Sequence, residues 1–329
     1  MGLTMTSTAS KVSALALFLV VAFVLVPWLI AVSGRSDLYY TLTSVALLSI
    51  ASAGVWLTFF IGRINIGQGA YALLGGYVSA ILVTAGGVSF WLSLPLAGLL
   101  CAGISVLIGL PILRLRGVYF AMVTLVLTEV ARLAALAVPL TNGAKGITDI
   151  PPPGAIRLFG LTLLPDFATL ANPRQAFYFV TVALMVLVFA GVYRLVHSRI
   201  GQLCLSLQQN EELASSIGVN VAALRIIAYA ISSFLGGIGG AMFVAIAQSI
   251  YPSSFAVADS VNFMLNCFLG GLGYVMGPLV GTFVLYFGWD FLFRTGEFQL
   301  LIYSMVLIAL MLVLPNGILS LFAPRRKES

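Results

Sequence analysis

Long runs of apolar residues, almost free of charge, follow one another along the whole chain. Residues 14–32, for example, read ALALFLVVAFVLVPWLIAV. A helix needs about 20 apolar residues to cross the hydrocarbon core of a bilayer, whereas the strands of a membrane barrel alternate apolar and polar residues. Because these runs are apolar throughout, they predict an all-α, polytopic transmembrane bundle of about ten spans. The predicted spans are 13–33, 41–62, 69–85, 91–112, 118–138, 176–196, 224–246, 256–270, 274–290 and 299–315.

The late part of this pattern is less regular than the rest. The window 256–270 is shorter than a full crossing and runs through the sequence GGLG into the next window. Residues 256–290 therefore form either two spans or a broken or re-entrant element. Glycine recurs at every fourth position within 236–240 and 273–281, which predicts flat helix surfaces where another helix packs closely.

Composition supports a membrane location, because 61% of the 329 residues are hydrophobic and only 8% are charged. Soluble proteins carry about a quarter charged residues. No long polar segment separates the apolar runs, so residues 1–329 are expected to form a single transmembrane domain. The net charge of +6 is explained by basic loops that face anionic lipid, and nucleic-acid binding is not needed to account for it.

Basic residues orient the predicted spans, because short cytoplasmic loops are enriched in lysine and arginine. With the N-terminus inside, the larger group is cytoplasmic: Lys11, Arg63, Arg114, Arg116, Arg194, Arg199, Arg225, Arg325, Arg326 and Lys327. The external group is Arg35, Lys145, Arg157, Arg174 and Arg294. Both termini are thus expected in the cytoplasm, with 139–175 an external loop and 197–223 a cytoplasmic loop. The glycines and prolines of the external loop predict a structured connection that cannot continue a helix.

The residues offer little enzymatic chemistry. The sequence contains no G-x-x-x-x-G-K-[ST] phosphate-binding loop, so any ATP must be bound and hydrolysed by a separate subunit. Cys101, Cys204 and Cys267 lack the paired spacing of metal sites or disulfide frameworks. The chain is therefore expected to be no enzyme and to hold no catalytic residue, cofactor or metal.

The cytoplasmic loop 197–223 contains a predicted short helix over 211–217. Asn210 is a strong N-cap, the acids Glu211 and Glu212 favour the first turn, and Gly218 is the usual residue just past a helix end. Its apolar residues recur at helical spacing, and these are Leu213, Ala214 and Ile217. The loop is either an ordinary hairpin against its own bundle or a docking helix for a soluble partner.

The sequence GQLCLSLQQNEELASSIGVN, residues 201–220, resembles the cytoplasmic coupling loop of permease subunits in branched-chain amino-acid ABC importers, the LivM-type family. The matching positions are Gly201, Asn210, Glu211, Ala214, Gly218 and Asn220. Four other stretches resemble the same family in order: LRLRGVYFAMVTLVLTEVARL (113–133), TNGAKGITDIPPP (141–153), FLGGLGYVMGPLVGTFVL (268–285) and LPNGIL (314–319).

This resemblance implies a permease subunit in the cytoplasmic membrane of a bacterium or archaeon. It implies a second, homologous permease, two cytoplasmic ATPase subunits and an external solute-binding protein, with a branched-chain amino acid or a related small solute as cargo. The alternative is a stand-alone secondary transporter or channel. The coupling loop of this family usually carries several arginines or lysines between its glycines. This chain departs from that pattern, because residues 202–217 contain neither. We therefore expect Leu213, Ala214 and Ile217 to pack on the ATPase, with Glu211 or Glu212 meeting its basic groups.

Two sets of polar residues lie within or beside predicted spans. Glu129 and Arg132 are three residues apart, hence on one helix face. They are either a structural ion pair or part of a solute pathway, because charges at membrane depth usually face an interior. Asn65, Gln68 and Tyr71 recur at spacings of three, so they either line a path or cap a helix start.

Overall fold

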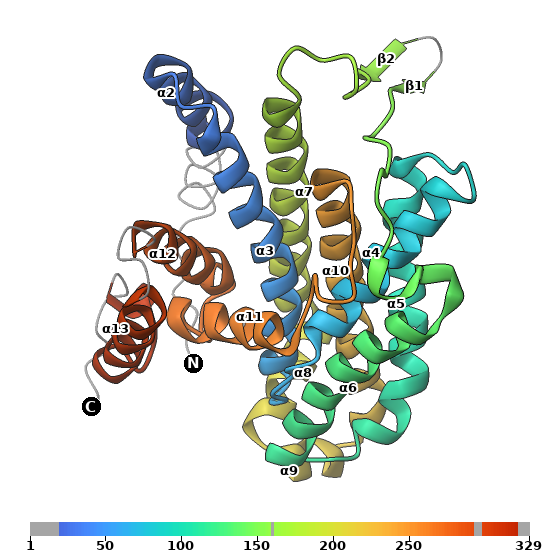
Figure 1. Cartoon of the computed structure of the whole chain (residues 1–329). Helices are drawn as coiled ribbons and strands as arrows, with labels where there is room; N and C mark the ends of the chain where they lie inside the picture. Colours follow the sequence, from blue (N-terminus) through green and yellow to red (C-terminus); the bar gives the residue numbers. More distant parts are fainter. Residues whose placement is uncertain (1–19, 159–160, 293–297, 322–329) are drawn as a thin grey trace.

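The computed structural model describes residues 20–158, 161–292 and 298–321 (Figure 1). Its helices are η1 (Val21–Leu25), α2 (Val26–Ser33), α3 (Asp37–Phe60), α4 (Gln68–Thr84), α5 (Phe90–Ile112), α6 (Val118–Ala137), η2 (Pro139–Thr141), η3 (Gly143–Lys145), α7 (Pro173–Val196), α8 (Arg199–Gln209), α9 (Glu211–Ser216), α10 (Val221–Ala247), α11 (Val257–Gly270), α12 (Gly277–Leu292), α13 (Gln299–Val313) and η5 (Ile318–Leu321). A short antiparallel hairpin, β1 (Ile156–Leu158) and β2 (Leu161–Leu164), interrupts this helical order.

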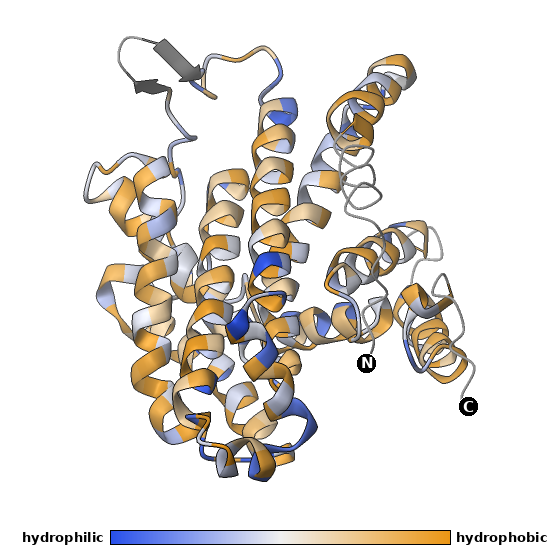
Figure 2. Ribbon diagram, turned by 180° about the vertical axis from the view of Figure 1, so that it is seen from behind, coloured by the Kyte–Doolittle hydropathy of each residue, from blue (hydrophilic) through white to orange (hydrophobic). Residues whose placement is uncertain are grey.

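The predicted all-α bundle is confirmed. A helix occupies the described part of every predicted window, although 13–19 and both termini lie outside the described residues. Five helices are long and apolar enough to cross a membrane, namely α3, α5, α6, α7 and α10. Three shorter apolar helices are Val21–Val32, α4 and α13. Figure 2 shows apolar ribbon along the bundle and hydrophilic ribbon around the end that carries α8 and α9.

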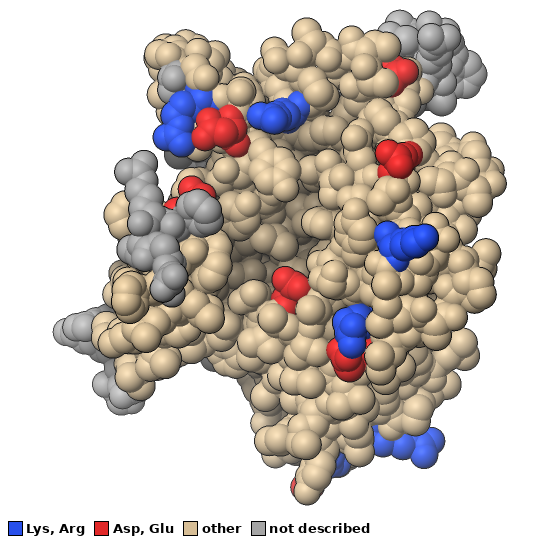
Figure 3. All heavy atoms as spheres, in the orientation of Figure 1, with Lys and Arg blue, Asp and Glu red and all other residues tan. Residues whose placement is uncertain are grey.

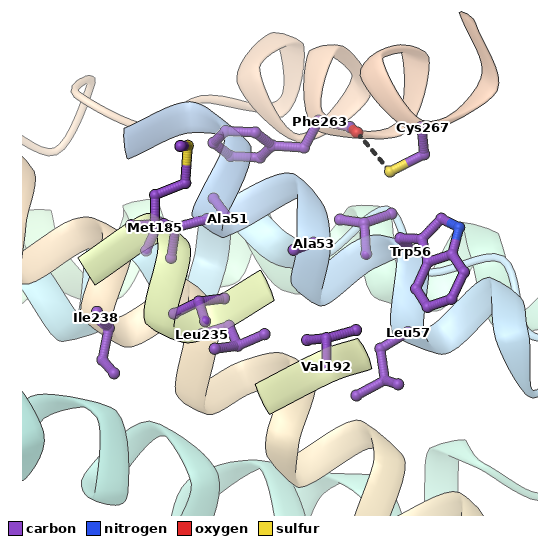
Figure 4. Close-up of a cluster of buried hydrophobic side chains, with 14 of the residues drawn as sticks. Ala51, Ala53, Trp56, Leu57, Met185, Val192, Leu235, Ile238, Phe263 and Cys267 are labelled. Atoms are coloured by element: carbon purple, nitrogen blue, oxygen red, sulfur yellow. Dashed lines mark hydrogen bonds between the residues drawn. The ribbon is translucent and has the colours of Figure 1, made fainter. Parts of the chain in front are cut away.

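The core of the bundle surrounds α10, which packs on α3, α4 and α5. Figure 4 shows side chains of α3, α7, α10 and α11 meeting in one apolar cluster that includes Leu57, Val192, Leu235 and Phe263. Water is excluded from this cluster, so it holds the long helices together through apolar contact.

Close contact between α4 and α10 depends on glycine. A Cβ on Gly240 would overlap the carbonyl of Ala72, and one on Gly75 would overlap the backbone of Gly237. Small residues at such positions let two helix backbones approach within van der Waals contact. The predicted packing role of 236–240 is confirmed, and in 273–281 Gly277 and Gly281 also meet backbone atoms, whereas Gly273 faces open space.

Of the two alternatives for 256–290, the structure shows the broken element. The helices α11 and α12, of 14 and 16 residues, are joined by a turn in which Gly271 has a φ of 113°. They pack on each other and lie across the direction of α3 and α7 (Figure 1). Trp56 donates its indole N–H to the carbonyl of Leu272 at 3.0 Å, which ties this turn to the long helix α3.

The described part of the loop 139–175 is structured, as predicted. Asn142, Gly143 and Gly146 adopt positive φ angles of 61°, 57° and 64°, which accounts for the Asn-Gly and Gly residues of this stretch. Ile147 exchanges backbone hydrogen bonds of 2.9 Å with Ile250, just beyond α10. The loop is therefore fixed to the end of the bundle opposite α8 and α9 (Figure 1).

Candidate coupling site

The connection between α7 and α10 is built from two helices, α8 and α9. The hydroxyl of Ser198 caps α8 by accepting from the backbone N–H of Gly201 at 3.3 Å. Gly201, Cys204 and Leu207 are buried at helical spacing, so α8 lies with one face on the bundle. A Cβ on Gly201 would overlap the carbonyls at the end of α7, and close packing therefore explains the glycine at this position. The helix α8 was not predicted from the sequence.

The predicted helix over 211–217 is confirmed and ends one residue earlier, at Ser216. The side chain of Asn210 accepts from the backbone N–H of Leu213 at 3.0 Å, which is the expected N-cap. Gly218 follows the helix with a φ of 85°, a conformation that disfavours other residues. Local sequence thus determines both ends of α9.

The orientation of α9 differs from the expectation for Ala214. Its side chain is only 2% exposed and packs into the core of this chain, whereas Leu213 and Ile217 are 63% and 72% exposed. Glu212 is exposed as well. Ala214 therefore fixes α9 to its own bundle, and the apolar surface open to a partner consists of Leu213 and Ile217. Helical spacing alone grouped all three residues because it does not say which flank the bundle covers.

Glu211 is the centre of a cluster of charged side chains. Its carboxylate lies 3.1 Å from the guanidinium of Arg116 and 3.6 Å from that of Arg63, and it is also bound by Arg225. Glu211 thus binds arginines of its own chain, which leaves the exposed Glu212 as the acid open to basic groups of a partner, and that contact stays a prediction. The three arginines come from the α3–α4 connection, the α5–α6 connection and the first turns of α10.

Burial makes this arrangement stronger than a surface ion pair. The side chains of Arg63 and Arg225 are only 5% and 10% exposed, and that of Glu211 is 24% exposed. Burial raises the pKa of Glu211, but the hydrogen bond from Arg225 and the three positive charges outweigh it, so this pKa lies below its ordinary value. Burial and the charge of Arg225 lower the pKa of Arg63.

One carboxylate shared by three guanidiniums leaves an excess of positive charge. The Nε and Nη2 atoms of Arg63 and the Nε atom of Arg225 are buried without a hydrogen-bond acceptor. Glu211 is thus the anion that compensates two buried cations, as buried charges require. One feature of the sequence pointed toward this cluster, since the charge rule assigned all three arginines to the same side of the membrane as 197–223.

Glu129 and Arg132 form the ion pair that their spacing predicts. The Nε atom of Arg132 donates to the Oε2 atom of Glu129 at 2.9 Å. Their side chains are 41% and 31% exposed, so the pair lies on a partly open face of α6 rather than in the interior of this chain. The structural pair is present, and a role in a solute path stays a prediction.

Asn65, Gln68 and Tyr71 have no exposed surface. Gln68 donates to the carbonyl of Ser232 at 3.0 Å, and the Tyr71 hydroxyl donates to that of Tyr229 at 3.0 Å. Both bonds connect α4 to α10, so in this conformation these side chains join helices and line no open path. The oxygen of Asn65 accepts from the N–H of Gly67 at 2.9 Å, at the start of α4.

The described residues contain no cluster of three or more histidine, cysteine or acidic side chains that could hold a metal ion. All three cysteines are buried and unpaired. An apolar bundle of long helices with a capped, polar helical connection at one end defines a polytopic membrane protein.

Comparison with known proteins identifies the particular family. Residues 38–315 match the family model "Branched-chain amino acid transport system / permease component". The chain belongs to this family, so it is a permease component of an ABC importer and its own activity is not enzymatic. Membership favours this function over a stand-alone transporter or channel.

Three relatives place the chain within its family. It is 30% identical to the high-affinity branched-chain amino acid transport system permease protein LivM of Escherichia coli K12, over 94% of this chain and 76% of the relative. It is 25% identical to the probable branched-chain amino acid transport permease protein LivH of Methanocaldococcus jannaschii, over 83% and 88%. It is 26% identical to the ribose import permease protein RbsC of E. coli K12, over 84% and 85%. No solved structure matches.

Proposed function

We propose that this permease imports a branched-chain amino acid or a related small solute and that α9 is its contact with a cytoplasmic ATPase. In this proposal the chain forms the solute path with a second, homologous permease. Two ATPase subunits bind ATP on the cytoplasmic side, and an external binding protein delivers the solute. The cytoplasmic membrane of a bacterium or archaeon holds the complex, with both termini in the cytoplasm.

The observation that carries this proposal is the cluster around Glu211. It connects α9 to the α3–α4 connection, to the α5–α6 connection and to α10. Because α10 packs on α3, α4 and α5, a displacement of α9 reaches the centre of the bundle. Coupling of this kind needs a contiguous, mechanically stiff connection between the moving element and the path.

The exposed surface of α9 has the character of a docking surface. Leu213 and Ile217 are large apolar side chains open to solvent in this chain, and apolar side chains seated in a partner's pocket carry much of the energy of an interface. The charge of Glu212, next to them, suits a basic group on the partner. Since 202–217 contains no lysine or arginine, apolar packing would provide most of the binding energy.

The distribution of arginine supports a cytoplasmic position for α9. The end of the bundle where α3, α5 and α7 finish and α6 and α10 begin carries Arg63, Arg114, Arg116, Arg194, Arg199 and Arg225. Cytoplasmic loops carry such an excess of positive charge. Figure 3 shows basic side chains at the lower edge of the molecule, the end at which Figure 1 places α9.

The docking proposal is tested with Ile217→Asp in the assembled transporter. A carboxylate in an apolar contact should weaken ATPase binding by about 2 kcal/mol or more, while Ala214 and Glu211 continue to hold α9 in place. The measurement is copurification of the ATPase subunits together with solute-stimulated ATP hydrolysis.

Leu140→Asp is the matched control, because Leu140 is 74% exposed at the opposite end of the bundle. It should leave ATPase copurification unchanged. Full copurification and full stimulated hydrolysis with Ile217→Asp would show that α9 does not dock and that the loop is an ordinary hairpin.

A further inference from the structure

The end of the bundle opposite α9 contains a hollow of about 570 Å³ between α3, α7 and the α10 end. Phe167, Phe177 and Ile246 form its apolar side, and Gln248 and Arg174 are polar groups on its wall. A second hollow of about 420 Å³ shares Tyr40 and Arg174 with it. The upper half of the face drawn in Figure 3 is hollowed, with charged side chains standing around it. Small-molecule sites have this size and this mixture of apolar walls and few polar groups.

The wall of the larger hollow is held in an unusual backbone conformation. Gln248 and Asp149 have φ angles of 53° and 57° although neither is glycine. The backbone N–H of Ile150 donates to the carbonyl of Gln248 at 3.1 Å, so the two strained positions lie at the same junction. Non-glycine residues in this conformation cost free energy and gather at binding sites.

Charge in the two hollows is only partly neutralised. Arg35 and Asp37 pair with each other at 3.1 Å. Arg174 and Asp290 line the same smaller hollow, and neither forms an ion pair with any residue that the structure describes. A cation and an acid thus share one cavity without compensating each other directly.

We propose that these joined hollows are an outer solute site that binds the zwitterion of an aliphatic α-amino acid. The carboxylate of the solute is bound by Arg174, its ammonium group lies toward Asp290, and its side chain packs on Tyr40 and Ile246. Behind these side chains lie the rings of Phe167 and Phe177, which are only 2% and 9% exposed and pack edge to face with their centroids 4.9 Å apart. The inference rests on the proposed import function and adds residues of the permease itself to solute recognition.

The chemistry of the site separates amino acids from sugars. A neutral sugar carries no charge that could neutralise the arginine and the acid, so both charges would stay uncompensated when it binds. A zwitterion satisfies both charges at once, and charge-assisted hydrogen bonds are about twice as strong as neutral ones.

The test uses thiol protection in the complete transporter in lipid nanodiscs, without binding protein or nucleotide. Ala168→Cys places an exposed thiol on the hollow, and the native cysteines are buried, so the new thiol should dominate the reaction with a membrane-impermeant maleimide. L-leucine, at concentrations on the order of millimolar, should slow this reaction several-fold. Ala144→Cys, exposed on the same loop but outside the hollow, should react at a rate that leucine does not change.

Arg174→Gln, added to Ala168→Cys, should raise the leucine concentration for half protection by about tenfold, and Arg174→Lys should restore part of the affinity. Leucinamide, which lacks the carboxylate, should protect weakly and equally with arginine or glutamine at position 174. ATPase copurification verifies the assembly of each variant.

Two results would overturn the outer solute site: no protection by leucine, or equal half-protection concentrations with Arg174 and with Gln at that position. The proposed function is tested separately. The same transporter is reconstituted into liposomes, and ATP-driven uptake of L-leucine is measured. Intact uptake without protection rejects the site alone, whereas absent uptake in the unmodified transporter rejects the function on which the site depends.

Discussion

Glu211 and Glu129 both pair with arginine, but the two pairings differ in origin and in consequence. Glu129 meets Arg132 within one helix, three residues away, on a partly exposed face of α6. Glu211 meets three arginines from three other elements, and two of these arginines are buried. The first pair follows from helical geometry, and the second exists only because the helices pack as they do.

The difference shows which ion pairs stabilise this bundle. An exposed ion pair within a helix contributes little, because water solvates both partners nearly as well when they are apart. A buried guanidinium has lost that water, so removing its carboxylate leaves an uncompensated charge. The cluster at α9 should therefore affect stability and coupling more than the pair on α6, and three measurements rank the two.

The largest effect is expected from Glu211→Gln. It leaves Arg63 and Arg225 without their anion, and breaking a buried pair of this kind costs several kcal/mol. Because Glu211 is itself 24% exposed, water can solvate part of the charge that is left behind. The free energy of unfolding is therefore expected to fall by about 2 kcal/mol. Thermal unfolding of the purified transporter measures the loss, and stimulated ATP hydrolysis should fall because α9 is released from α10.

Arg116→Gln serves as the control for this variant, because Arg116 binds the same carboxylate but is 65% exposed. Its cost should stay below about 1 kcal/mol. Equal losses for Glu211→Gln and Arg116→Gln would contradict the view that burial, and not contact alone, gives the cluster its strength.

Acid should weaken the same cluster in a predictable direction. The pKa of Glu211 is lower in the folded chain than its ordinary value of 4.5. The stability that this carboxylate contributes is thus complete above about pH 4.5 and is lost as the pH falls through the lower folded-state pKa. In unfolding experiments between neutral pH and pH 3, Glu211→Gln should lack this part of the acid dependence. If stability fell with pH in parallel for the unmodified permease and for Glu211→Gln, this acid dependence would not come from Glu211.

The smallest effect is expected from Glu129→Gln, because its partner Arg132 remains partly exposed and can reorient. The unfolding midpoint of the permease should shift less than with Glu211→Gln, and leucine uptake should persist. A larger shift that arises only in the assembled transporter would mean that a neighbouring subunit covers this face of α6. Lost uptake with unchanged stability would instead support a role in the solute path.

Sequence alone predicted most of the helices. Each of the ten windows contains helix wherever the structure describes it, because the length of an apolar run is a local property that the bilayer thickness limits. The ends of α9 were predictable for the same reason, since Asn210 caps one end and Gly218 closes the other. The helix α8 was missed because its polar residues hide a short apolar face formed by Gly201, Cys204 and Leu207.

The candidate site was predicted only in part. Helical spacing placed Leu213, Ala214 and Ile217 together, but burial separates Ala214 from the other two. Glu211 was recognised as a coupling residue, yet its partners were sought on another subunit. The charge rule placed Arg63, Arg116 and Arg225 on the same side of the membrane as Glu211, but no pattern along the chain paired them with it, because each belongs to a different segment.

The sequence by itself determined that the chain is a helical membrane permease, where its helices lie and where α9 begins and ends. These properties depend on neighbouring residues and on the thickness of the bilayer, so they can be read along the chain. Only the tertiary structure decided which face of α9 stays open, which arginines share the Glu211 carboxylate and how Arg174 and Asp290 come to line one cavity. Those features require helices distant in sequence to pack with a definite rotation, and that rotation is set by the side chains of all the partners together.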